Sequence, residues 1–149
     1  MYPREDCGMR IRKEIYQRIL DSCPAAPPET GGILGAHGVV IDTVVFDPGS
    51  ETTDQAVYYP DVEFLNAKLE RWRQDRIAFR GLFHTHPRGQ DSLSQADIEY
   101  IGSIMMSLPS SVTQLYFPIV FPYSHMISFK AINQKHNVII ERDMIYTVP

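Results

Sequence analysis

The sequence has few cysteines, no long apolar run and no cluster of basic residues. Cys7 and Cys23 are the only two cysteines among 149 residues, and they form no C-x-x-C pair. Neither a disulfide framework nor a thiolate zinc finger is therefore indicated, and we expect two reduced thiols. Cys7 lies in a polar N-terminal stretch, and the sequence assigns it no role.

Charge of either sign is also modest. Fourteen basic against 18 acidic residues give a net charge of −4, and no Lys/Arg stripe could neutralise a phosphate backbone, so nucleic acid is not an expected partner. No stretch approaches the roughly 20 apolar residues of a membrane span, and charges replace the apolar core of a signal peptide. We expect a cytoplasmic protein with no membrane partner; its oligomeric state stays open.

Hydrophobic periodicity predicts alternating helices and strands. The GGILG segment lacks the spacing of a phosphate-binding loop, so nucleotide binding is not indicated. Apolar residues recur at helical spacing in three segments, and β-branched or aromatic runs predict strands in the others. The expected helices cover 11–20, 61–76 and 94–108, and the expected strands cover 29–36, 38–48, 57–59, 77–86, 114–121, 125–132 and 137–148. This order predicts one domain over 1–149, of α/β class, with a mixed, mostly antiparallel sheet flanked by helices.

A pair of histidines ends the expected strand at 77–86. His84 and His86 are two positions apart, so both side chains project from the same face while Thr85 projects from the other. Asp97 lies one turn into the next expected helix, where its carboxylate can turn back toward the strand end. Three ligands would leave a fourth position for water, which is typical of a catalytic rather than a structural zinc site.

The wider pattern resembles the JAMM signature of the JAB/MPN metallopeptidases. It consists of Glu29 followed by T-G-G-I-L-G, then H-T-H-P from His84, and then Ser94-x-x-Asp97. The resemblance implies one zinc ion per chain, held by His84, His86 and Asp97. It implies that Glu29 is the general acid and base, and that Ser94 donates a hydrogen bond to the oxyanion. It also implies the JAB/MPN fold, with layering like that of cytidine deaminases, and similarity to its short bacterial members.

The resemblance implies a substrate class as well. The family hydrolyses an amide bond after a C-terminal glycine, so a ubiquitin-like or sulfur-carrier protein is the expected partner. Two other functions stay open. One is that of a non-catalytic MPN module that acts as a scaffold. The other is that of the RadC-like proteins, which share the H-x-H-P and S-Q-A-D-I motifs.

Each candidate residue also has a simpler interpretation. Ser94 and Asp97 together form a helix-capping signature, which needs no metal. His84 and His86 could be hydrogen-bonded polar residues at a strand end. Glu29 could be an ordinary exposed carboxylate after two prolines, because its place beside the metal rests on the resemblance and not on spacing.

Overall fold

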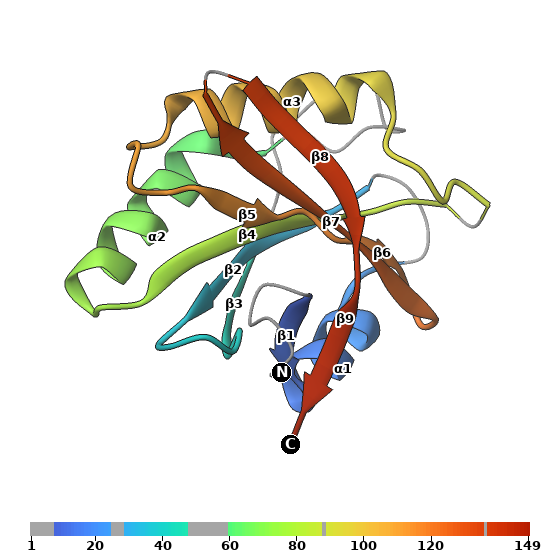
Figure 1. Ribbon diagram of the computed structural model, residues 1–149. Coiled ribbons are helices and arrows are strands. Elements are labelled where there is room, and N and C mark those ends of the chain that lie inside the picture. The colour runs from blue at the N-terminus through green and yellow to red at the C-terminus, as the bar shows by residue number, and fades with distance from the viewer. Residues whose placement is uncertain (1–7, 25–28, 48–59, 88, 136) are drawn as a thin grey trace, which may run out of the picture.

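The computed structural model describes residues 8–24, 29–47, 60–87, 89–135 and 137–149. Figure 1 shows how the helices and strands of these residues are arranged. The helices are α1 (Lys13–Ser22), α2 (Val62–Gln74) and α3 (Gln95–Ser107). The strands are β1 (Met9–Arg12), β2 (Gly31–Ala36), β3 (Thr43–Asp47), β4 (Ala78–Thr85), β5 (Gln114–Tyr116), β6 (Ile119–Phe121), β7 (His125–Gln134), β8 (Asn137–Asp143) and β9 (Ile145–Val148).

Strands β2 to β8 form one mixed sheet. β2 lies between β3 and β4 and is antiparallel to both. β5 and β6 follow one another along β4, parallel to it, and both are antiparallel to β7. β8 is antiparallel to β7 on its other side. The predicted fold class, helices on a mixed and mostly antiparallel sheet, is therefore confirmed.

The two faces of the sheet are covered by different elements (Figure 1). Successive strand residues face opposite sides, so Ile33 and Leu82 pack with α2 and α3, whereas Leu34 and Phe83 pack with α1 and β1. Burial of these apolar side chains contributes about 1.5–3 kcal/mol for each large one. We call the first side the α3 face and the second the α1 face.

Glycine allows the strands around the site to approach closely. A Cβ atom on Gly81 of β4 would lie 1.8 Å from the carbonyl oxygen of Tyr116, and one on Gly32 would lie 2.3 Å from that of Val45. Neither position accepts a side chain without displacement of a neighbouring backbone. These contacts fix how β2 and β4 pack beside their neighbours.

The structure corrects several expected boundaries. The expected strand 38–48 begins only at Thr43. The segment 11–20 begins as strand β1, because Ile11 pairs with Thr147 and bridges Ile41, and the helix starts only at Lys13. The expected strand 114–121 is interrupted at Pro118, whose missing N–H cannot join a ladder. The expected strand 137–148 divides at Met144 into β8 and β9, which belong to different sheets. The expected strand 57–59 lies outside the described residues.

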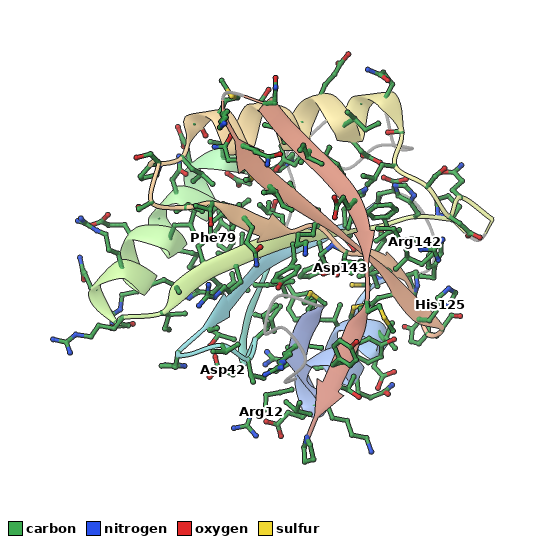
Figure 2. The ribbon with its side chains drawn as sticks, in the orientation of Figure 1. Arg12, Asp42, Phe79, His125, Arg142 and Asp143 are labelled. Atoms are coloured by element: carbon green, nitrogen blue, oxygen red, sulfur yellow. The ribbon has the colours of Figure 1, made fainter. Side chains whose placement is uncertain are left out.

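β9 forms a separate parallel pair with β1, at the side of the molecule where the C-terminus lies (Figure 1). Arg12 ends β1 close to the C-terminus (Figure 2), and its guanidinium donates a hydrogen bond of 2.5 Å to the carbonyl of Pro149. The departure of β9 from the large sheet leaves part of β7 without a neighbour. None of the helices in the described residues has the length and apolar character needed to cross a bilayer.

Candidate metal centre

His84 and His86 lie at the C-terminal end of β4, on the α3 face. His84 is paired with Gly31 of β2 on one side and with Ile119 of β6 on the other. The amide of His86 donates to the carbonyl of Val120 at 3.0 Å, so the strand geometry continues through it. Both imidazoles are largely buried, and they project in the same direction, as their spacing predicts.

Asp97 reaches the two histidines from the first turn of α3. Its Oδ1 lies 3.3 Å from His84 Nε2, and its Oδ2 lies 3.1 Å from His86 Nε2. The backbone N–H of Ser94 donates to Asp97 Oδ2 at 2.9 Å, and the N–H of Asp97 donates to Ser94 Oγ at 3.0 Å. The capping box that the sequence suggested is thus present, and it aims the carboxylate at the histidines.

The hydrogen bond of His86 Nδ1 determines the tautomer of the ring and so the protonation of Nε2. His86 Nδ1 lies 3.0 Å from the carbonyl oxygen of Gln90, which can only accept a hydrogen bond. Nδ1 therefore carries a proton, and in the neutral ring Nε2 presents a lone pair. That lone pair faces Asp97 and His84. Orientation of a ligating histidine by a backbone carbonyl is typical of metal sites.

The electrostatics of the cluster favour a cation at its centre. Burial raises the pKa of Asp97, but hydrogen bonds to His84, His86 and the Ser94 amide more than offset it, so the pKa lies well below its usual range. Burial lowers the pKa of His86, yet Asp97, the Gln90 carbonyl and the charge of Glu29 bring it above its ordinary value. The surroundings therefore favour an ionised carboxylate and favour positive charge beside it.

The residues present fit a metal ion. One ligand atom from each of His84, His86 and Asp97 lies within 4.8 Å of the others. The two Nε2 atoms are 2.9 Å apart, and both lie next to the carboxylate of Asp97. The three predicted ligands are therefore brought together, and they could hold a metal ion.

Glu29 is placed next to this cluster by the pairing of β2 with β4. The amide of Thr85 donates to the Thr30 carbonyl at 2.8 Å, and the amide of Thr30 donates to Thr85 Oγ1 at 2.9 Å. These bonds extend the register that pairs Gly31 with His84, so Glu29 lies opposite His86 and on the same face. Glu29 is half-buried, and its charge acts on His86. Its catalytic role stays a prediction.

The structure also places the remaining candidates. Ser94 is exposed at the N-terminus of α3, and its catalytic role, like that of Glu29, stays a prediction. Cys23 is a buried free thiol, as expected, and Cys7 lies outside the described residues. The Gln90 carbonyl and the Thr30–Thr85 pair were not predicted. Only the position of Gln90 in the polar loop after His86 could have suggested a contact.

Comparison with known proteins gives a fold but no family. No family model matches the sequence, and no curated protein matches it. Among solved structures, protein DSY2949 from Desulfitobacterium hafniense is 16% identical with a TM-score of 0.65, and the match covers 94% of each chain. A protein from Salinibacter ruber is 14% identical with a TM-score of 0.56, covering 94% of this chain and 92% of that one.

A third structure is AF2198, a JAB1/MPN domain protein from Archaeoglobus fulgidus, at 16% identity. The match covers 93% of this chain and 98% of that one, with a TM-score of 0.47. The first two similarities show that this arrangement of helices and sheet occurs in other proteins of about the same length.

Proposed function

We propose that this chain is a zinc-dependent peptidase of the JAMM type, which hydrolyses an amide bond after a C-terminal glycine of a ubiquitin-like or sulfur-carrier protein. The observation that carries the proposal is the convergence of His84, His86 and Asp97, with Glu29 opposite His86. Two imidazoles and one carboxylate are the donor set of catalytic zinc sites, which keep one position open.

Different residues of the chain would bind the metal and orient its ligands. His84, His86 and Asp97 would hold the ion, and the bonds from the Gln90 carbonyl and the Ser94 amide keep two of these ligands in place. A bound zinc would act as a Lewis acid on the scissile carbonyl and lower the pKa of a water from 15.7 to about 7.

Glu29 would take a proton from the attacking water and deliver it to the nitrogen of the leaving amine. Its position opposite His86 suits that task, because the carboxylate and the ligands project from the same face of the sheet. Ser94 Oγ accepts a hydrogen bond from the Asp97 amide, so its own O–H remains available to donate to the oxygen of the scissile carbonyl as negative charge develops there.

The substrate class rests on the resemblance of the Glu29, H-T-H-P and Ser94-x-x-Asp97 pattern to the JAMM signature. The same fold could serve a scaffold without catalysis or a RadC-like function. The ligand set favours the enzyme over the scaffold, because the scaffold needs neither three convergent ligands nor a carboxylate beside them.

Metal analysis and hydrolysis together test the proposal. The wild-type protein, purified without added metal, is expected to contain one zinc per chain and to release a fluorogenic amine from a ubiquitin-like protein ending in Gly-Gly. Glu29→Ala should keep the zinc and lose hydrolysis, whereas His84→Ala/His86→Ala should lose both. A wild type without metal would support the scaffold, and full turnover by Glu29→Ala would refute the assigned base.

A further inference from the structure

The outer edge of β7 is open along its first residues. β8 pairs with β7 from Gln134↔Asn137 as far as Ser128↔Asp143, and the chain then leaves to form β9. On the inner side, residues 125–127 remain paired with β6. In the described part of the chain no strand pairs with them on the outer side. An unpaired strand edge is a template for another strand.

The direction of the backbone groups on this edge follows from known bonds. The carbonyl of Phe129 accepts from Phe117, and the amide of Asn133 donates to Thr113, so odd-numbered residues of β7 point their N–H and C=O groups inward. Strand alternation then directs the N–H and C=O of Met126 outward, into the open edge. These two groups are what an added strand would bond.

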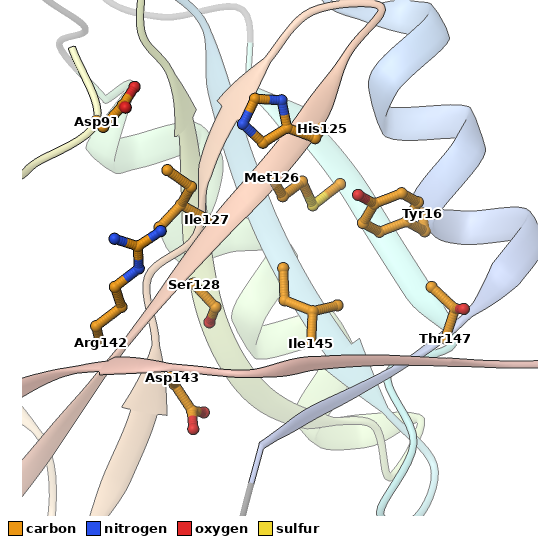
Figure 3. A pocket seen from close by; sticks show the side chains of 10 residues that line it. All are labelled: Tyr16, Asp91, His125, Met126, Ile127, Ser128, Arg142, Asp143, Ile145 and Thr147. Atoms are coloured by element: carbon orange, nitrogen blue, oxygen red, sulfur yellow. The ribbon is translucent and has the colours of Figure 1, made fainter. Parts of the chain in front are cut away.

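A hollow of about 590 Å³ occupies this edge (Figure 3). It is lined by β7, by the ends of β8 and β9, by Tyr16 of α1 and by Asp91 of the loop between the metal ligands. Ser128 Oγ is fully buried beside it and has no hydrogen-bond partner among the described residues. Its hydroxyl is therefore a polar group that the described residues do not satisfy.

Arg142 supplies positive charge to the hollow, whose lining also includes the carboxylates of Asp91 and Asp143. It is paired with Phe129 on the α3 face, and Figure 3 shows its guanidinium next to Ile127. Arg142 is exposed and has no ion pair in the described residues. It also lines a second hollow of about 430 Å³, with Leu93, Ile98 and Phe129. A cation therefore lies where two hollows meet, beside the loop that carries Gln90.

We propose that this open edge binds an extended peptide that adds to β7 as a strand, with an acidic residue against Arg142. The peptide residue opposite Ile127 would project onto the α3 face, next to Arg142. Its two neighbours would project onto the α1 face, where Met126, Tyr16 and Ile145 offer apolar surface. An apolar–acidic–apolar alternation is the matching sequence, and main-chain bonds to Met126 supply the rest of the affinity.

The test uses two labelled peptides, acetyl-TVEVT-amide and acetyl-TVKVT-amide, measured by fluorescence anisotropy and by amide shifts in NMR spectra. The wild type is expected to bind the glutamate peptide at least about tenfold more tightly than the lysine peptide, with the largest shift at the Met126 amide. Arg142→Glu should reverse the preference, because it replaces the cation with a carboxylate. Lys68→Glu, an equal charge change on α2, should leave it unchanged.

This site is independent of hydrolysis, so His84→Ala/His86→Ala should bind the glutamate peptide as the wild type does. Failure of both peptides to bind at millimolar concentration would overturn the proposal, and so would shifts that do not include Met126. It would also be overturned if the peptide bound only after residues 2–7 were deleted or after a dimer dissociated. Those results would assign the edge to the chain's own N-terminus or to a second copy.

Discussion

The Nε2 atoms of His84 and His86 lie 2.9 Å apart, and both face the carboxylate of Asp97. At this distance the two nitrogens can share a proton in a hydrogen bond, or they can share a metal ion. Because the ligands come from β4 and α3, an ion bound there would also join the sheet to a helix.

Zinc should therefore stabilise the folded chain. At a zinc concentration a hundred times the Kd, binding adds about 2.7 kcal/mol to the free energy of unfolding. For a chain of this length that is a rise in Tm of roughly 5–10 °C. Thermal denaturation with zinc and with a chelator measures it. His84→Ala/His86→Ala should show no zinc-dependent rise, and an equal rise in that variant would place the ion elsewhere.

Substitutions at Ser94 can separate its capping role from its proposed catalytic role. Ser94→Ala removes the acceptor for the Asp97 amide and should cost about 1 kcal/mol in the free energy of unfolding. Ser94→Asp keeps an acceptor for the cap but has no hydroxyl to donate. Both should lower kcat by a factor of about 10²–10³, if the hydroxyl stabilises the oxyanion.

Urea unfolding and turnover of the Gly-Gly substrate give the two readouts for Ser94. Ser94→Thr, which retains the hydroxyl, is the control and should keep most of the activity. Wild-type turnover by Ser94→Asp would show that Ser94 is only a cap.

Gly81 should not tolerate a methyl group. A Cβ atom there would lie 1.8 Å from the Tyr116 carbonyl oxygen, so β4 and β5 would have to separate. We expect Gly81→Ala to destabilise the fold by about 3 kcal/mol or more in urea unfolding. Gly102→Ala in α3 is the matched control, because a Cβ atom there would meet nothing within 4 Å outside the helix's own backbone. It should raise the free energy of unfolding by roughly 0.5–1 kcal/mol.

Cys23 should react slowly and should make stability depend on alkaline pH. Burial raises the pKa of its thiol, against a smaller lowering by Thr30. The folded state therefore retains its proton longer than the unfolded chain, so stability is lost as pH rises above about 8.5, where an unfolded cysteine ionises. In a Cys7→Ser background, labelling by a disulfide reagent at pH 8 should be at least about 100-fold slower than in urea.

The alkaline dependence of Cys23 can be checked by urea unfolding between pH 7 and 9.5. Cys23→Ala should remove that part of the decline that the thiol causes. If the two proteins lose stability in parallel, other groups titrate in that range.

Local pattern was sufficient for much of the fold. Apolar spacing located the three helices. The predicted start of α2 was also correct, because the side chain of Asp61 accepts a hydrogen bond from the Phe64 amide and caps the helix. The single strand before the histidines was also correct, because its residues are apolar on both faces. Spacing alone predicted that His84 and His86 share a face, and the capping signature placed Asp97 in the first turn of its helix.

Apart from the break at Pro118, the errors arose where pairing over a long sequence distance decides the structure. Ile11 lies in a strand because Ile41 and Thr147 lie beside it, and no local signal reports those partners. The same holds at Met144, where a continuous β-branched and aromatic run divides between two sheets. The position of Glu29 opposite His86 depends on the register of β2 with β4, which the spacing could not give.

The metal ligands are close to one another in the sequence, whereas Glu29 is far from them, and the two parts of the centre should therefore respond differently to partial unfolding. His86 and Asp97 are 11 positions apart, so a single strand, loop and helix can bring the ligands together with little loss of chain entropy. The bond between Thr30 and Thr85, which brings Glu29 opposite His86, joins segments 55 positions apart and requires the assembled sheet. Mild denaturant should therefore release the base before the ion, so that a preparation can contain a full complement of metal and still be inactive.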